Sequence, residues 1–522
     1  MKKGKLEIIY IPFGLKNNMK HLVAKIIDEV IQYRYHYLLL ILFILLSAYI
    51  RYVPLMEGNF PFLFDHGRDL MAVKEIVIEG NQTLIGPFTG LQGVFHGALH
   101  YYLLTIPFIL TGGNPASPTY FLATLFLVGV LATYLLLGRI FNRQTALIAA
   151  LFFALAAGSL NATKHFWNPY WIPFIMVFWV AILYSGIFRK KNHLIVAFFL
   201  AGIMAQCDIA FGVVLIPAMI VLMLVFNRSL FVSKQFLLAL GAFAVTFATH
   251  LIFDIRNKFL MTNAIINLLQ GKNTSLGFPI EFPDRLYYRL DEIQDATVLA
   301  LSGNANLAYV LFGILLAALV YVIIFRKWSD LRNLTFLLLI PITYFIFFLI
   351  YSRAAWSWYW VGLQVPYYFA VAYSLWIFYQ NIPKLKPAIL IILALFTVIP
   401  LIPGSTEFLK TEPGIYNNEM RAIHTAFNDA NGQPFSLFFY TPPIYTYQYD
   451  YLAWWYAKRN NIPAPAQNKD QLFYLILEED KQNPDAPKGW KETVIKEGKT
   501  IWIKKLPGNL TVERREGNGY KK

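Results

Sequence analysis

Long apolar runs separated by short polar connections make up most of the chain between residues 36 and 402. Twelve low-charge segments reach or approach the roughly 20 residues that an α-helix needs to cross about 30 Å of hydrocarbon. These segments are 37–53, 98–111, 118–138, 144–160, 169–188, 193–206, 210–226, 235–253, 305–325, 334–351, 361–379 and 387–402. The pattern predicts a polytopic α-helical membrane domain over residues 36–402, with about 11–13 transmembrane helices.

The charges in the connections predict the orientation of these helices. Short connections that are rich in Lys and Arg lie on the cytoplasmic side of membrane proteins. Five connections fit this rule: Arg139 with Arg143, residues 189–191, Arg228 with Lys234, Arg326 with Lys327 and Arg332, and Lys384 with Lys386. The lysine-rich start of the chain is predicted to be cytoplasmic for the same reason, which places residues 51–97 and the chain after residue 402 on the outer side.

Ends on opposite sides of the membrane require an odd number of spans, whereas the pattern gives twelve candidates. The segment 97–110 is short and contains Pro107, so we interpret it as a re-entrant or interfacial segment that does not cross. A thirteenth span that the pattern misses would also satisfy the count. The predicted location is the cell membrane, with several passes.

Three further segments are predicted beside the spans. Residues 1–35 contain apolar positions at helical spacing among lysines, which is typical of an amphipathic helix on the cytoplasmic surface. Residues 51–97 form a first long outer loop with a juxtamembrane helix, and residues 254–304 form a second. Two long loops on one side provide enough chain to build a site above the bilayer.

Composition supports the membrane assignment and excludes other classes. Hydrophobic residues make up 57% of the chain and charged residues 14%. The net charge of +15 follows from the cytoplasmic connections and their contact with anionic lipid, and nothing in the sequence indicates nucleic acid as a partner. The single cysteine, Cys207, excludes a disulfide within the chain.

The composition becomes that of a soluble domain over residues 403–522. The stretch "NNEMRAIHTAF" predicts a helix, "FSLFFY" a strand, "YDYLAWWYAKRN" a helix and "QLFYLILE" a strand. The stretch "ETVIKEGKTIWIKKL" predicts two strands joined at Glu-Gly-Lys. These elements predict a small α/β domain on the outer side.

A cluster of ionisable residues follows the first span, in "FPFLFDHGRDLMAVKEIV" over residues 60–77. Asp65 and Asp69 flank Arg68 here. One interpretation is local: Asp65 caps the helix that follows, and Asp69 complements the dipole of that helix. The other is chemical, because a carboxylate at the membrane boundary reaches a water-soluble acceptor while a lipid-borne substrate approaches from the bilayer.

The layout of the chain resembles that of GT-C membrane glycosyltransferases of the protein-O-mannosyltransferase and lipid A aminoarabinose-transferase type, which is the glycosyltransferase family 39-like group. The resemblance covers residues 30–400, and Asp65 with the stretches "GRD" and "HGALHYYL" carries it at residue level. It implies a sugar donor on polyprenyl phosphate and inversion at the anomeric carbon. It also implies that Asp65 is the base, with Asp69 as a second candidate, and that the acceptor is a protein hydroxyl or a lipid or cell-envelope glycan.

The leaving group of such a reaction is a lipid phosphate, which cations and hydrogen-bond donors stabilise. The predicted partners are Lys164 and Arg353 first, followed by Arg68, His96, His100 and His165. Lys164 and Arg353 lie in the aromatic connections "NATKHFWNPYW" and "YSRAAWSWYW", and an aromatic belt with snorkelling cations at the lipid interface explains them equally well.

No metal site is predicted and no cofactor is required. His96 and His100 have the i, i+4 spacing of two ligands on one helix face, which leaves a divalent metal open, but no acidic ligand motif accompanies them. The preferred interpretation is therefore a glycosyltransferase whose partners are membrane lipid, a polyprenyl-phosphate sugar and a protein or glycolipid acceptor. The alternatives are a transporter or flippase of lipid-linked saccharides and a ligase of such saccharides.

Overall fold

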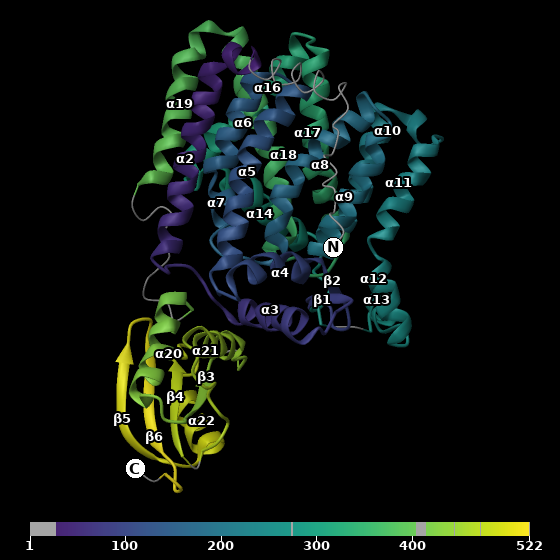
Figure 1. The fold of residues 1–522 in the computed structure, drawn as a ribbon. Coiled ribbons are helices and arrows are strands. Elements are labelled where there is room, and N and C mark those ends of the chain that lie inside the picture. The colour runs from purple at the N-terminus through teal and green to yellow at the C-terminus, as the bar shows by residue number, and fades with distance from the viewer. Residues whose placement is uncertain (1–27, 273–274, 403–413, 443, 470, 521–522) are drawn as a thin grey trace, which may run out of the picture.

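The computed structural model describes residues 28–272, 275–402, 414–442, 444–469 and 471–520. A bundle of helices is followed by a small domain that contains a sheet (Figure 1). The bundle consists of α2 (Arg34–Met56), α4 (Leu99–Thr111), α5 (Ser117–Ile140), α6 (Arg143–Leu155), α8 (Ile172–Phe188), α9 (His193–Cys207), α10 (Ile209–Phe226), α11 (Lys234–Val245), α12 (Ala248–Arg256), α16 (Ala305–Ile324), α17 (Trp328–Ile350), α18 (Gln364–Asn381) and α19 (Lys386–Val398). The connections contain α3 (Phe64–Lys74), α7 (Ala157–Asn161), α13 (Leu260–Leu269), α14 (Asp284–Ile293) and α15 (Ala300–Ser302).

All twelve predicted segments contain helix, which confirms the polytopic α-helical class. Among the described residues, eight helices are long and apolar enough to cross a membrane, or nine if α11 and α12, bent by 49°, count as one span. Three predicted segments are shorter helices: α4 and α6 have 13 residues each and α9 has 15. The segment 144–160 divides because Ala156 is extended (ψ 139°) and separates α6 from α7. Residues 1–27 of the predicted amphipathic segment lie outside the described residues.

Helices α3 and α4 lie across one end of the bundle, which we call the α3 end (Figure 1). The 13 residues of α4 rise about 20 Å, less than the roughly 30 Å of bilayer hydrocarbon. The basic connections meet at the opposite end, where the Arg189 guanidinium donates to the Arg139 carbonyl (2.8 Å) and Lys327 donates to Asn381 (2.7 Å). The two ends of the bundle therefore differ in charge and in architecture.

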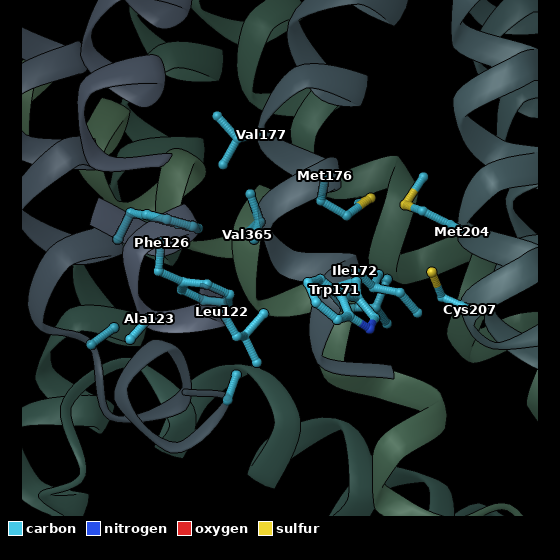
Figure 2. Packing of buried hydrophobic residues seen from close by; sticks show 14 of the residues in the cluster. Leu122, Ala123, Phe126, Trp171, Ile172, Met176, Val177, Met204, Cys207 and Val365 are labelled. Atoms are coloured by element: carbon cyan, nitrogen blue, oxygen red, sulfur yellow. The ribbon is translucent and has the colours of Figure 1, made fainter. Parts of the chain in front are cut away.

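Interlocked apolar side chains hold the bundle together. Leu122 and Phe126 on α5, Met176 on α8 and Met204 on α9 belong to one buried cluster, in which Met176 lies between the α5 residues and Met204 (Figure 2). Leu122, Phe126, Met176 and Met204 have no exposed surface. Trp171 packs within this cluster (Figure 2), and its indole N–H donates to His100, a polar residue of the α3 end.

The domain after the bundle is α/β, as predicted. Its elements are α20 (Tyr416–Ala430), β3 (Ser436–Tyr440), α21 (Tyr447–Asn460), β4 (Leu472–Glu478), α22 (Ala486–Trp490), β5 (Lys499–Leu506) and β6 (Leu510–Glu516). The strand order is β3-β4-β6-β5, with β3 parallel to β4 and the other pairs antiparallel. Because parallel strands need a crossover, α21 connects β3 to β4.

The prediction of two strands in "ETVIKEGKTIWIKKL" is wrong. Residues Lys491–Ile495 form a single π-helical turn that buries Ile495 against the sheet, and β5 begins only at Lys499. Its hairpin partner is β6, which the hydrophobic pattern does not indicate because the strand carries many charges. Arg515 pairs with Glu513 of the same strand at 2.8 Å, and Arg514 pairs with Asp429 of α20 at 2.9 Å.

The small domain docks directly on α3. A methyl group at Gly67 would overlap the backbone of Tyr447 and Gln448, so α3 and α21 approach without an intervening side chain. The Tyr451 hydroxyl donates to the Gly113 carbonyl at 2.7 Å, just after α4. The Phe60 ring stacks on the ring of Tyr416 at 4.8 Å. Helix α3 therefore lies between the membrane bundle and the small domain.

Candidate active site

Asp65 lies in the first turn of α3 and is not the cap of that helix. The helix begins at Phe64, so the interpretation of Asp65 as an N-cap is wrong. The His66 side chain takes the reciprocal capping role, because its Nδ1 accepts from the Leu63 backbone N–H at 2.6 Å. The Asp65 side chain is thereby left for other contacts, and 27% of its surface is exposed.

Arg68 links the two aspartates of the cluster. Its Nη1 contacts Asp65 Oδ1 at 2.6 Å, and its Nε and Nη2 donate to Asp69 Oδ1 at 2.9 and 2.8 Å. The guanidinium also lies over the Phe88 ring, 5.2 Å from its centre, in β1 (Ile85–Phe88). Asp69 is fully buried, whereas Asp65 reaches solvent. The Arg68 guanidinium therefore fixes the position of the accessible Asp65 carboxylate relative to the buried Asp69 carboxylate.

His100 and Trp171 extend this network into the bundle. The Trp171 indole N–H donates to His100 Nδ1 at 2.9 Å, and His100 Nε2 lies 2.9 Å from Asp69 Oδ2. An indole nitrogen only donates, so Nδ1 of His100 accepts and the ring proton resides on Nε2, where it is donated to Asp69. Trp171 closes the turn Asn168–Trp171 that precedes α8. The network thus joins α3, α4 and the start of α8.

The environment separates the pKa values of the two carboxyls. Burial raises the pKa of Asp65, and the charge of Arg68 offsets only part of this effect. Burial alone would also raise the pKa of Asp69, but Arg68 and His100 together outweigh it and hold that pKa below its ordinary value. Two neighbouring carboxyls with opposed pKa shifts are typical of acid–base sites, and Asp65 is the more basic of the two.

A second pair of histidines fastens the N-terminal end of α3. His66 Nε2 lies 3.0 Å from His165 Nδ1. Since His66 Nδ1 accepts from Leu63, its Nε2 carries the proton and donates to His165. Burial and the neighbouring ring lower the pKa of His66, while burial and the charge of Lys164 lower the pKa of His165 to about 3. Both rings are therefore neutral near pH 7 and connect α3 to residues 162–167.

His96 lies apart from this network. Its Nδ1 accepts from the Ile209 backbone N–H at 3.3 Å, at the start of α10. Burial lowers its pKa to about 3, so it carries no charge near neutral pH. His96 and His100 thus face different partners in spite of their spacing. Among the described residues, no group of three or more His, Cys, Asp and Glu side chains could hold a metal ion.

The two preferred phosphate ligands have different surroundings. Lys164 is partly exposed and lines a small cavity of about 30 Å³ together with Arg51 and Asn59. Arg353 is 8% exposed and donates to the Gly277 carbonyl, while its own carbonyl accepts from Arg289. Arg353 therefore fastens the second long loop, whereas Lys164 remains next to the His66–His165 pair.

The comparisons with known proteins identify the architecture. No family model matches the sequence, and no curated protein matches it. The structure is similar to that of ArnT from Cupriavidus metallidurans, with a TM-score of 0.59 over 92% of this chain and 98% of that chain at 13% identity. The fold is that of the GT-C membrane glycosyltransferases.

Two further structures agree with this GT-C assignment. ArnT bound to undecaprenyl phosphate has a TM-score of 0.57 at 13% identity, covering 92% of this chain and 99% of that chain. The archaeal oligosaccharyltransferase AglB from Archaeoglobus fulgidus, in complex with an inhibitory peptide and a dolichol-phosphate, has a TM-score of 0.51 at 13% identity. That match covers 93% of this chain and 74% of that chain. The resemblance that the layout of the sequence suggested is thus present in the fold.

Sequence reasoning missed how the site is assembled. It took Asp65, Arg68, Asp69, His100 and His165 as separate candidates, whereas the structure joins the first four in one network and ties His165 to His66. It also missed Trp171, which fixes the tautomer of His100. The stretch "NATKHFWNPYW" contains both His165 and Trp171, so its unusual content of polar and aromatic residues was the available signal.

Proposed function

We propose that this chain is an integral-membrane glycosyltransferase. In this proposal it transfers a sugar from a polyprenyl-phosphate donor to an acceptor hydroxyl, and Asp65 is the general base. The acceptor class is a protein hydroxyl or a lipid or cell-envelope glycan. The proposal rests on a contrast between the two aspartates. Asp69 is fully buried and accepts from both Arg68 and His100, whereas the Asp65 side chain is 27% exposed on a helix at the end of the bundle.

The similar structures support the substrate class. One similar ArnT structure contains undecaprenyl phosphate, and the AglB structure contains a dolichol-phosphate and a peptide. Both lipids are polyprenyl phosphates, and a peptide is a water-soluble molecule. A carboxylate at the α3 end suits an enzyme that receives one substrate from the lipid phase and the other from water.

The proposed reaction is a single displacement with inversion. The acceptor oxygen attacks the anomeric carbon while Asp65 takes the proton of its hydroxyl. The bond between the anomeric carbon and the phosphate oxygen breaks, and its electron pair leaves with the polyprenyl phosphate. Because burial raises the pKa of Asp65, its carboxylate is a stronger base than an exposed aspartate.

Two cations are suited to meet the negative charge that develops on the leaving phosphate. Arg68 is 14% exposed and already contacts Asp65, so its guanidinium lies beside the proposed reacting centre. Lys164 immediately precedes His165 in the same connection, and His165 is hydrogen-bonded to His66, the residue after Asp65. The contacts of Arg353 and His96 favour structural roles for these two residues.

The charge distribution supports catalysis on the non-cytosolic side. The basic connections lie at the end of the bundle opposite α3, and such connections prefer the cytoplasm. This orientation places α3 and the small α/β domain outside, with the first described residues of the chain on the cytoplasmic side. A lipid-linked donor with its sugar on the outer leaflet would then lie next to Asp65.

The test is the variant Asp65→Asn in proteoliposomes that are supplied with a panel of labelled polyprenyl-phosphate hexoses and pentoses. Asparagine keeps the shape of the side chain but accepts no proton, so transfer should fall by about 10²–10⁴-fold while the lipid-linked donor still binds. Asp485→Asn is the matched control, because it makes the same change at an exposed position of the small domain. Unchanged turnover in Asp65→Asn would refute the assignment of the base.

A further inference from the structure

A cavity of about 420 Å³ separates α19 from the rest of the bundle. Residues of α2, α6, α18 and α19 form its walls. Figure 1 shows α19 at the outer edge of the bundle beside α2. The network around Asp65 contributes no residue to this cavity, so the cavity needs an explanation of its own.

The cavity exists because α19 packs on the bundle at few points. Of the 13 residues of this helix, only Ile389 and Phe396 are buried. The Phe396 ring lies 4.6 Å from that of Phe152 on α6, about 15 Å along α19 and thus halfway across the roughly 30 Å of hydrocarbon. Leu39 and Leu390 line the cavity and are 42% and 54% exposed, so the cavity opens to the lipid-facing surface.

The length of the cavity matches one leaflet of a bilayer. Its lining on α19 extends over residues 389–397, a rise of about 12 Å. The lining on α2 extends over residues 36–43 and that on α6 over residues 144–151, about 10 Å each. Since one leaflet contributes about 15 Å of hydrocarbon, the cavity accommodates an extended acyl chain over most of that depth.

The walls of the cavity are apolar. Leu147, Ile148, Leu151 and Leu393 supply hydrocarbon surface from two sides. The Thr397 hydroxyl donates to the Leu393 carbonyl at 2.8 Å, so this residue is satisfied within its own helix. Water finds few hydrogen-bond partners along such walls, whereas an acyl chain from the surrounding bilayer fills them without loss.

The polar lining residues gather at the end opposite α3. His36 is the third residue of α2, Gln144 the second of α6 and Tyr379 the third from the end of α18. Helices α2 and α6 begin at this end of the bundle, and α18 ends there (Figure 1). Arg143, next to Gln144, pairs with Glu29, so this pair adds no net charge. The cavity therefore has an apolar depth and a polar mouth.

Two lysines give the mouth a positive charge. Lys386 Nζ lies over the Tyr379 ring, 5.2 Å from its centre, and Trp376 stacks on the same ring at 5.6 Å and 20°. Lys384 is exposed in the turn Pro383–Leu385 that precedes α19. Among the described residues that line the cavity, none is acidic. Lysines at the membrane surface attract anionic lipid headgroups, so the mouth favours a phosphate with net negative charge.

We propose that this cavity binds one anionic glycerophospholipid from the leaflet at the end opposite α3. One acyl chain occupies the apolar depth, and the phosphate lies at the mouth beside Lys386 and Gln144. The bound lipid fills the gap between α19 and α6 and thereby fastens α19 to the bundle. A polyprenyl-phosphate donor is not the occupant, because Asp65 lies at the other end of the bundle. The proposal is independent of the role of Asp65.

Native mass spectrometry of the full-length, delipidated protein tests the proposal. Titration with dioleoyl-phosphatidylglycerol should give one saturable adduct, and dioleoyl-phosphatidylcholine, which has no net charge, should bind roughly tenfold more weakly. Lys386→Gln should weaken the binding of phosphatidylglycerol about fivefold and leave that of phosphatidylcholine unchanged. Lys190→Gln removes an equal charge from an exposed position that does not line the cavity, and should have no effect.

A second variant fills the cavity. Ala394 lines the cavity and is exposed, so Ala394→Trp should fold normally and abolish both the adduct and the rise in Tm that phosphatidylglycerol causes. Ala388→Trp is the matched control, because Ala388 is exposed on the same helix but does not line the cavity.

Three results would overturn the proposal. The first is equal binding of the two phospholipids, and the second is an undiminished adduct in Ala394→Trp. The third is loss of a dimer instead of a lipid in that variant, which would assign the cavity to a second copy of the chain. Displacement of phosphatidylglycerol by equimolar undecaprenyl phosphate would likewise assign it to the lipid-linked substrate and refute the choice of a glycerophospholipid.

Discussion

The two sides of the connection between α7 and α8 differ in how their polar groups are satisfied. On the α3 side, Arg68 and His100 supply donors to the fully buried Asp69. On the other side, the buried amide of Gln364 has no partner for its Nε2 among the described residues. Paired charges fix the positions of the Asp65 and Asp69 carboxylates, whereas the neutral amide of Gln364 has one donor without a partner among the described residues. The comparison separates charged groups that are fully paired from a buried neutral group that is not.

The largest effect is expected when the positive charge of Arg68 is removed from the buried network at α3. Arg68→Met leaves Asp69 buried without its guanidinium, which should destabilise the protein by about 3–5 kcal/mol and abolish transfer. Thermal unfolding in detergent and labelled-sugar transfer measure the two effects. If Arg68→Met unfolds at the same temperature as the unmodified protein, the network does not hold α3 as described.

The pH dependence tests the state of Asp65. As a base, Asp65 acts only when it is ionised, so kcat/KM should fall about tenfold for each pH unit below its pKa. Because burial raises the pKa of Asp65, this fall should begin at a higher pH than for an ordinary aspartate. Arg68→Lys keeps the cation beside Asp65 and should retain this fall of kcat/KM at low pH. A kcat/KM that stays constant down to the pH range in which an ordinary aspartate is protonated would contradict the raised pKa of Asp65.

A smaller effect is expected when His100 is no longer held in one tautomer by the Trp171 indole N–H. Trp171→Phe removes the donor to His100 Nδ1, which frees the ring to lose its bond to Asp69, and kcat should fall about tenfold with KM for the donor unchanged. Trp179→Phe is the matched control, because Trp179 is equally buried but its indole N–H has no partner among the described residues. Equal losses of kcat in the two variants would show that Trp171 acts through packing alone.

The smallest effect, and the one of opposite sign, is expected at the buried amide of Gln364. Gln364→Leu removes an unpaired buried donor, so the free energy of unfolding should stay constant or rise by up to about 1 kcal/mol. Gln206→Leu makes the same change at a buried amide that is paired, since its Nε2 donates to the Thr246 carbonyl at 2.6 Å. That variant should lose about 1–3 kcal/mol. Equal destabilisation of both variants would remove the distinction between the two regions.

The sequence was sufficient for the parts of the fold that depend on local pattern. Low charge and apolar content predicted the helical segments, and the spacing of apolar residues predicted the helices α20 and α21 and the strands β3 and β4. Breaks within a segment were not predictable, because Ala156 interrupts α6 without any Gly or Pro at that position. The strand β6 was missed since it carries many charges, which pair within the strand (Arg515 with Glu513) or with Asp429 of α20, a residue that only the fold brings near.

The candidate site also contains one part that local sequence pattern predicts and another part that it does not. Asp65 was found because its place after the first span is a feature of the chain order. The links that organise it join residues that are far apart in sequence, such as His66 to His165 and His100 to Trp171, and no local periodicity encodes them. Gln364 gave no signal at all, because the lack of a partner for its amide depends on the packing of Gly158 and Tyr368 around it.

The contact at Gly67 restricts which C-terminal domains can be exchanged onto the membrane bundle. The helix that carries Asp65 touches the backbone of α21 with no side chain between them, so its path is shaped by a domain encoded more than 300 residues later. A terminal domain grafted from another protein would seat here only if its own helix offered an equally bare stretch of main chain. Chimeras that exchange residues 414–520 without regard to position 67 should therefore displace the Asp65 carboxylate even though they leave every membrane helix intact.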